Sequence, residues 1–411
     1  LNGSSTIDTQ AFGMTLDGVV SGTGPMDKIG TGTLTLNNSN TYSGPTNLNF
    51  GTIAVGANTA LGTGQLNMAG GTILQAAVSG LVVTNDIATL AGGRIDQGAG
   101  TFQLDGVISG AGSISTIGTG NLILNGNNTF LGGLGINVSG STVTLLTNTA
   151  AGASGIAIND GATLAAGVSG LVVANNIVTT GSGLIDQGAG TFQLDGVIGG
   201  VGSISTVGTG ELILNGDNTF SGGLGINVSG STVTLGTNTA AGVSGIALND
   251  GATLKAGVSG LVVANNIVTT GSGLIDQGAG TFQLDGVIGG VGSISTVGTG
   301  ELILNGDNTF SGGLGINVSG STVTLGTNTA AGVSGIALND GATLKAGVSG
   351  LVVANNIVTT GSGLINQGSG IFTLNGTIGG AGSISTVGTG ELVLNGNNAF
   401  TGGLGINVSG S

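Results

Sequence analysis

The sequence predicts an all-β fold, a right-handed parallel β-helix (β-solenoid) of about 18 coils with little or no α-helix. Three observations predict it. The chain repeats itself, its apolar residues alternate with polar ones over short stretches, and Gly, Asn, Asp or Ser separates these stretches. Such alternation is typical of half-buried strands, and those four residues tolerate the positive φ of tight turns. No segment has apolar residues at a helical period over the length of a helix.

The repeat has a period of 90 residues. Residues 201–290 and 291–380 differ at six positions, so 84 of 90 residues are identical. We interpret the chain as a single continuous β-solenoid over residues 1–411, a fragment of a longer array. Its repeat units are expected at residues 1–110 (degenerate), 111–200, 201–290, 291–380 and 381–411 (partial).

Each unit divides again into shorter pieces that have the length of one coil. One unit divides into pieces at 208–230, 231–251, 252–273 and 274–297, so a piece is about 22 residues long. Each holds two or three short alternations, which suits one coil of a solenoid. Coils that stack at roughly 4.8 Å would give a rod on the order of 85–90 Å long, to which each copy adds four coils.

Like residues are expected to stack between coils. Two sets of phenylalanines recur with the same period as the units and are expected to fill the core. Asn125 follows Asp105, and Asn215 follows Asp195, at a spacing close to one coil. We therefore predict Asn/Asp ladders at that corner. The two phenylalanine sets are Phe102, Phe192, Phe282 and Phe372, and Phe130, Phe220, Phe310 and Phe400.

The composition excludes several classes of function. The chain has no His and no Cys, so it lacks disulfides, a thiolate nucleophile, the usual ligands of zinc, copper, haem or iron–sulfur centres, and the commonest general base. Lys28, Arg94, Lys255 and Lys345 are its only basic residues, against 18 Asp and Glu, so nucleic-acid binding is not expected. Disorder is the rival interpretation because glycine makes up 91 of 411 residues, but 39% hydrophobic residues and regular alternation oppose it.

No targeting or membrane segment is predicted. The chain has neither the pattern of a signal peptide at its start nor a run of apolar residues long enough to span a membrane, so we expect no membrane insertion within this fragment. The absence of cysteine suits a reducing compartment and a secreted protein equally well.

One short motif recurs five times and resembles a known family. Its pattern is G-T-G-x-L-x-L-N-x-x-N-x-aromatic-x-G, and it occurs at residues 30–44, 118–132, 208–222, 298–312 and 388–402. The motif resembles the passenger-associated transport repeat of bacterial autotransporters, also called the autotransporter-associated β-strand repeat. The resemblance implies a passenger domain that is secreted through the outer membrane of a Gram-negative bacterium and folds outside the cell as a β-helix.

Recurrent acids are the first candidates for catalysis. Asp186 and Asp195 recur as Asp276 and Asp285, and a polysaccharide hydrolase requires two carboxyl groups about 5–10 Å apart. However, these acids follow the structural period and become Asn366 and Asn375 in the last copy. Roles in turns and ladders explain both facts, so we predict no catalytic residue.

Three other patterns also have structural explanations. Residues 222–227 resemble a Gly-Gly-x-Gly-x-Asp calcium repeat but occur only once per copy, with Asn in place of the carboxylate. Thr-Val-Thr at 232–234 and 322–324 is too sparse for a continuous ice-binding face. Asn227 begins a glycosylation sequon but also precedes a turn. The absence of Gly-Lys-Ser/Thr and of His excludes a phosphate loop and a Ser-His-Asp triad. We therefore expect no cofactor-binding residue and no metal site.

The sequence therefore predicts an extracellular, non-enzymatic protein on the bacterial outer-membrane surface. The first hypothesis is a rigid stalk or adhesin segment of an autotransporter-like protein. The second is a subunit of an extracellular filament or matrix that assembles end to end by β-augmentation. The third and weakest is a β-helix that binds or cleaves carbohydrate. The partners expected are a host or neighbouring-cell surface, or other copies of the chain joined end to end.

Overall fold

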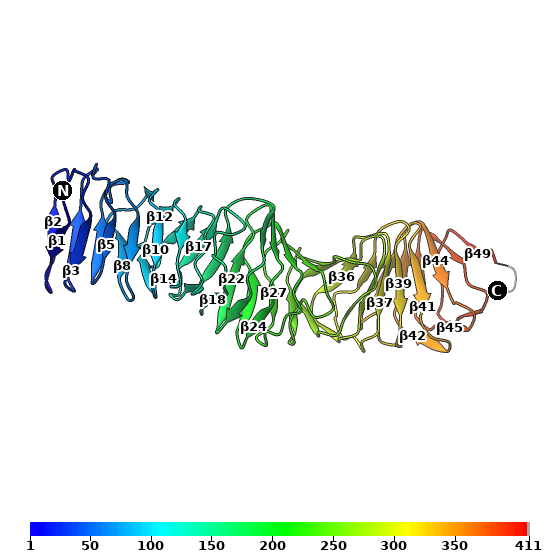
Figure 1. The fold of residues 1–411 in the computed structure, drawn as a ribbon. Helices are drawn as coiled ribbons and strands as arrows, with labels where there is room; N and C mark the ends of the chain where they lie inside the picture. Colours follow the sequence, from blue (N-terminus) through cyan, green and yellow to red (C-terminus); the bar gives the residue numbers. More distant parts are fainter. Residues whose placement is uncertain (409–411) are drawn as a thin grey trace. The chain divides into compact units, whose positions relative to one another are not determined.

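A computed structural model describes residues 1–408 and confirms the predicted fold class. Over these residues the chain is all-β, without helix, and its parallel strands stack as a β-solenoid of about 19 turns (Figure 1). It contains two compact units: unit 1 comprises Leu1–Ser205 with Phe220–Gly222, and unit 2 comprises Thr206–Thr219 with Gly223–Ser411. The described part of the chain contains no helix long and apolar enough to span a membrane.

Unit 1 has three faces, and the chain visits them in turn. Two faces each hold one sheet, here named B and C, and the third holds sheet A followed by a new pair of strands. Sheet A contains β1 (Ser5–Asp8), β3 (Met26–Ile29), β5 (Thr46–Leu48), β7 (Leu66–Met68), β10 (Ile87–Thr89) and β13 (Ile108–Ser109), and the new pair is β20 (Leu171–Val173) and β23 (Thr191–Leu194). Sheet B contains β2 (Met14–Leu16), β4 (Thr33–Leu36), β6 (Thr52–Val55), β8 (Ile73–Ala76), β11 (Gly93–Asp96), β14 (Ile114–Thr116), β16 (Leu134–Ile136), β18 (Ile156–Ile158), β21 (Ile177–Thr179) and β24 (Ile198–Gly200). Sheet C in this unit contains β9 (Leu81–Val83), β12 (Thr101–Leu104), β15 (Asn121–Leu124), β17 (Thr142–Leu145), β19 (Thr163–Ala166) and β22 (Ser182–Asp186). β25 (Ser203–Thr206) lies where the two units meet in the sequence.

Unit 2 also has three faces, here named I, II and III in the order in which the chain visits them. Face I holds β26 (Glu211–Leu214), β28 (Thr232–Leu235), β30 (Thr253–Ala256), β33 (Ser272–Asp276), β36 (Ser293–Thr296), β38 (Leu314–Ile316), β40 (Ile336–Leu338), β43 (Ile357–Thr359) and β46 (Ile378–Gly380). Face II holds β31 (Leu261–Val263), β34 (Thr281–Leu284), β37 (Glu301–Leu304), β39 (Thr322–Leu325), β41 (Thr343–Ala346), β44 (Ser362–Asn366), β47 (Ser383–Thr386) and β49 (Leu404–Ile406). Face III holds β27 (Leu224–Ile226), β29 (Ile246–Leu248), β32 (Ile267–Thr269) and β35 (Ile288–Gly290), then two turns of loop, then β42 (Leu351–Val353), β45 (Ile371–Leu374) and β48 (Glu391–Leu394).

The strand register gives the length of one turn. On face I, eight successive register steps lead from Glu211 to Gly379, so one turn takes about 21 residues. Four of these steps lead from Leu274 to Val358, yet the equivalent of Leu274 in the next copy is Leu364. A copy is therefore longer than four turns. The expectation that one copy equals four coils is wrong. Four turns do not use all the residues of a copy, and the remaining residues carry the chain onto its next face.

The core follows the predicted alternation. In β37 the inward Leu302 and Leu304 are buried, and the outward Glu301 and Ile303 are half-buried. The phenylalanines are buried as expected in all described copies except the last, where Phe400 is half-buried. They do not form rows with one another, however. Phe282 is on face II and Phe372 on face III, and the register neighbours of Phe282 are Leu261 and Leu302.

The predicted ladders are present. Asn125 donates from Nδ2 to Asp105 at 3.1 Å, and Asn305 donates to Asp285 at 2.7 Å. In the copy at 291–380, where Asn375 replaces the acid, Asn395 donates to it at 2.9 Å. Unit 1 has a longer ladder, in which Asn67 donates to Asn47 at 2.7 Å and Asn47 donates to Asp27 at 2.6 Å. Each rung therefore pairs polar side chains that would otherwise require water.

Glycine is required where two turns stack backbone to backbone. A Cβ at Gly300 would lie 2.0 Å from the carbonyl oxygen of Gly280 in the turn below. At Gly379, on an open strand of face I, a Cβ would meet nothing within 4 Å. We expect Gly300→Ala to lower the free energy of unfolding by about 1–3 kcal/mol, because the stacked turns must separate.

The matched control is Gly379→Ala, which should be neutral or slightly stabilising because alanine loses less backbone entropy than glycine. Urea denaturation of both variants measures the difference. Equal midpoints for the two variants would show that the turns do not stack closely.

Candidate functional site

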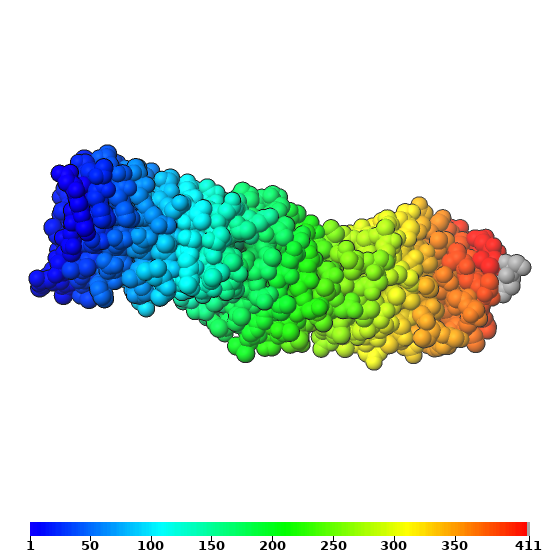
Figure 2. Space-filling view, in the orientation of Figure 1, coloured from blue at the N-terminus to red at the C-terminus, as the bar shows by residue number. Residues whose placement is uncertain are grey.

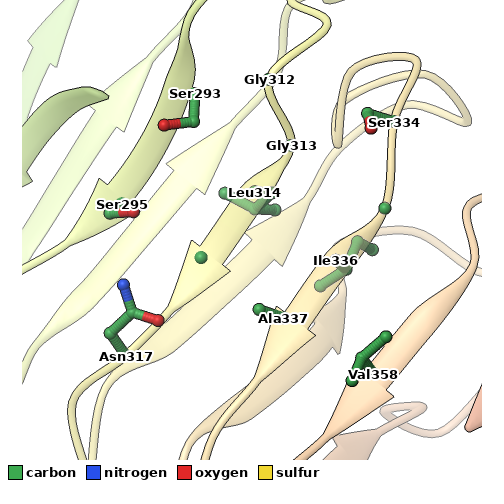
Figure 3. A pocket seen from close by; sticks show the side chains of 12 residues that line it. Ser293, Ser295, Gly312, Gly313, Leu314, Asn317, Ser334, Ile336, Ala337 and Val358 are labelled. Atoms are coloured by element: carbon green, nitrogen blue, oxygen red, sulfur yellow. The ribbon is translucent and has the colours of Figure 1, made fainter. Parts of the chain in front are cut away.

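A depression on face I of unit 2 lies over a row of small side chains. It encloses about 410 Å³ and crosses β36, β38, β40 and β43 (Figure 3). Ser295, Gly315, Ala337 and Val358 are register partners on these four strands. Gly315 leaves its strand bare, and a Cβ there would approach Ser295 Oγ at 2.7 Å and Asn317 Nδ2 at 2.8 Å. Small side chains at one outward row therefore produce the hollow.

Unit 1 has the same depression at the equivalent residues. It encloses about 310 Å³ on sheet B, where Ser115, Gly135 and Ala157 are register partners. Neither depression is lined by an acidic or basic side chain. Within each unit, the space-filling view shows residues of neighbouring colour in the bar packed against one another (Figure 2). Serine hydroxyls, asparagine amides and exposed backbone can form hydrogen bonds there, and the aliphatic side chains of the lining supply apolar contact. The linings provide no acid–base pair.

The acids that the sequence singled out serve the turns. Oδ1 of Asp186 and of Asp276 each accepts the backbone N–H two residues later, at 2.9 Å. Asn366 makes the same bond at 2.9 Å, which explains why Asn can replace Asp there. Asp285 Oδ1 accepts from Gln283 at 2.8 Å as well as from Asn305, and Asp195 accepts from Gln193 at 2.8 Å. Within residues 1–408 no group of three acids is close enough to hold a metal ion.

The other candidate segments are also part of the stack. Gly223, in the segment that resembles a calcium repeat, has φ +95° and precedes β27. Asn227 accepts a hydrogen bond at 2.9 Å from Asn249 one turn later, so the sequon residue belongs to a ladder. Thr234 is only 5% exposed and donates its hydroxyl to Glu211. Thr324 donates in the same way to Glu301.

An ion pair that the sequence analysis missed links strands two turns apart. Lys255 Nζ lies 3.0 Å from Glu211, and Lys345 Nζ lies 2.7 Å from Glu301. Both pairs are 44 residues apart. A comparison of the repeats could have revealed these pairs. The copy at 111–200 has Asn121 and Ala165 at the corresponding positions, so the later copies gain the Glu and the Lys together.

These pairs make folding depend on pH. Burial acts to raise the pKa of Glu211, but hydrogen bonds from Thr234 and Lys255 and the charge of Lys255 outweigh it, so the pKa lies below its usual value of 4.5. The pKa of Glu301 is lowered in the same way. A carboxyl whose pKa is lower in the folded state stabilises the fold above its unfolded pKa, and this stabilisation disappears as pH falls through the folded pKa.

We expect the double variant Glu211→Gln, Glu301→Gln to be less stable than the native chain at pH 6, by less than about 1 kcal/mol per half-exposed pair. The difference should shrink as pH falls below 4.5 and the glutamates of the native chain become protonated in the folded state. Denaturation midpoints at a series of pH values from 6 downwards measure it. A difference that stays constant throughout this series would contradict an electrostatic origin.

Lys28, which the sequence analysis only counts among the basic residues, occupies an unexpected place. Its side chain is fully buried at an inward position of β3. Its Nζ donates to the carbonyls of Ile29, Gly30 and Phe50 at 3.0, 2.7 and 3.0 Å. Burial lowers the pKa of Lys28, and the charge of Asp8 partly opposes this. The inward position could have been read from the alternation of Met26 and Lys28.

The recurrent motif has a defined place in the fold. In the copy that starts at residue 291, the motif contains β37 on face II and most of a loop that crosses face III in place of a strand and leads to β38 on face I. Asn308, buried in that loop, accepts the backbone N–H of Ile288 one turn below at 2.6 Å and donates to the carbonyl of Ala330 one turn above at 2.7 Å. Its amide thus takes over hydrogen bonds that a strand would make, and Phe310 fills the core beneath the loop.

Comparison with known families identifies this motif. The sequence model of the family described as the passenger-associated transport repeat matches residues 26–55, 207–231, 297–321 and 387–410. The chain carries the passenger-associated transport repeat. Four of the five segments predicted from the sequence lie within these matches, and 118–132 lies outside them. The structure nevertheless gives that fifth segment the same bonds, because Asn128 accepts from Ile108 and donates to Ala150.

A curated relative is similar over part of the chain. The chain is 37% identical over 146 residues to the adhesin BmaC autotransporter of Brucella suis biovar 1 (strain 1330). The aligned stretch makes up 34% of this chain and 4% of that protein, so the chain corresponds to a small part of its relative. No solved structure matches the chain.

Proposed function

We propose that this chain is part of the extracellular passenger of a bacterial autotransporter, where it serves as a non-catalytic stalk or adhesin segment. The observation that carries the proposal is the passenger-associated transport repeat, which occurs in four matched segments. Its loop asparagine makes equivalent bonds at Asn40 and at Asn308. Similarity to an autotransporter adhesin supports the same class of function.

The structure is suited to a mechanical role. Successive turns are joined by parallel backbone ladders, side-chain ladders and buried core residues within each unit. Stability in such a stack grows with each neighbouring pair of turns, and no single site is required for it. The depressions have uncharged linings, which suits contact with a surface more than acid–base chemistry.

The purified 411-residue chain tests the proposal in two measurements. Negative-stain electron microscopy should show discrete rods, whereas micrometre-long fibres of the same width would favour a filament subunit. Beads coated with the chain should bind host or neighbouring cells more than beads coated with the same chain after denaturation. Release of reducing ends from a panel of polysaccharides would overturn the non-catalytic assignment. Rods that bind no cell would support a stalk and contradict an adhesive role.

A further inference from the structure

Equivalent strands of successive copies occupy different faces of unit 2. The strand that begins Glu-Leu, the first strand of the recurrent motif, is β26 on face I, β37 on face II and β48 on face III. These strands begin at Glu211, Glu301 and Glu391, one full copy apart. Each copy therefore places the same strand one face further on.

The register explains this step. Four turns on face I lead from Leu274 to Val358, but the equivalent of Leu274 in the next copy is Leu364, six positions later. Because a turn takes about 21 residues and has three faces, this surplus is close to one face. The loops of the motif shift in the same way. Residues 305–313 cross face III between β37 and β38, whereas residues 395–403 cross face I between β48 and β49.

Unit 1 shows the same step independently. The equivalent strands there are β4 on sheet B and β15 on sheet C, which begin at Thr33 and Asn121. The depression on sheet B of unit 1 and that on face I of unit 2 are built from equivalent residues, so the outward surface belongs to the copy and moves with it.

We infer that the array displays one surface in three directions: each copy presents its outward residues one face further round, and the same surface returns to a face only at every third copy. A flat partner, such as a cell surface, would then meet one copy in three, and no direction around the axis would lack a copy. Insertion or deletion of one copy would turn everything that follows it by one face while leaving every local contact as it is.

Two pairs of spin labels in unit 2 test the inference, and the native chain has no cysteine to interfere. Val268 and Val358 are equivalent outward residues of successive copies, each 52% exposed, on faces III and I. Leu274 and Val358 are joined by four register steps on face I. The variants are Val268→Cys with Val358→Cys, and Leu274→Cys with Val358→Cys.

Double electron–electron resonance should give a clear contrast. Four turns at roughly 4.8 Å place the Leu274 and Val358 labels roughly 20 Å apart, whereas a further step onto another face places the Val268 and Val358 labels farther apart than that. Far-UV circular dichroism confirms that both variants keep the fold. The reverse order, with the shorter distance between Val268 and Val358, would mean that copies repeat on one face and would overturn the inference.

Discussion

Replacing Phe102 with alanine is expected to lower the free energy of unfolding of unit 1 by about 3–5 kcal/mol. Phe102 is fully buried, and its register neighbours are Leu81 one turn below and Leu122 one turn above. The change leaves a cavity between Leu81 and Leu122 on the two neighbouring strands. Because each turn contacts only its neighbours, the loss should appear first as local opening of those turns.

Native-state hydrogen exchange at the amides of β12 and β15 measures this opening. Phe12, which is 72% exposed in the same unit, provides the matched control. Phe12→Ala makes the same chemical change without a cavity and should alter stability by no more than about 0.5 kcal/mol. Similar losses in the two variants would mean that Phe102 is not a core residue.

Asn308→Ala is expected to lower the free energy of unfolding by about 2–6 kcal/mol, because two buried backbone groups each lose a hydrogen-bond partner at a cost of about 1–3 kcal/mol. Asn308 is 1% exposed and bonds both to Ile288 one turn below and to Ala330 one turn above. Alanine fills part of the space but offers no hydrogen bond. The loss of stability in Asn308→Ala should therefore be larger than the small change in buried apolar area suggests.

The amide of Ile288 reports directly on this bond, and its hydrogen exchange should accelerate in Asn308→Ala. The control is the exposed neighbour Asp307, which bonds to Thr329 at the surface. Asp307→Ala should leave the exchange of Ile288 unchanged. Slow exchange of Ile288 in Asn308→Ala would contradict the role assigned to this asparagine, and with it the explanation of the motif.

Much of the architecture can be predicted from short-range patterns in the sequence. Alternation such as that of Glu301 to Leu304 predicts a half-buried strand, and Gly or Asn between such stretches predicts a turn. The spacing of Asp105 and Asn125 predicted their hydrogen bond correctly. The turn role of Asp276 was also predictable, since aspartate accepts nearby backbone N–H groups and asparagine does so equally.

Residues that meet across turns were harder to predict. The pair of Glu301 and Lys345 depends on two whole turns between them, and an error of one residue per turn would have separated the side chains. The buried position of Lys28 depends on three carbonyls, one of them from Phe50 on the next turn. The assignment of four coils to a copy failed for the same reason, because the error of one-third of a turn becomes visible only when strands are paired.

The sequence by itself determined the strand-and-turn content, the parallel stacking and the family motif, because these depend on side-chain alternation and on residues within one turn. Only the tertiary structure decided which face each copy occupies, why Asn308 is buried and which charges meet. Those properties depend on the number of residues in a closed turn, which is set by how the backbone packs at three corners. The length of a copy is not a whole number of turns, and this mismatch determines how the repeats are arranged around the axis.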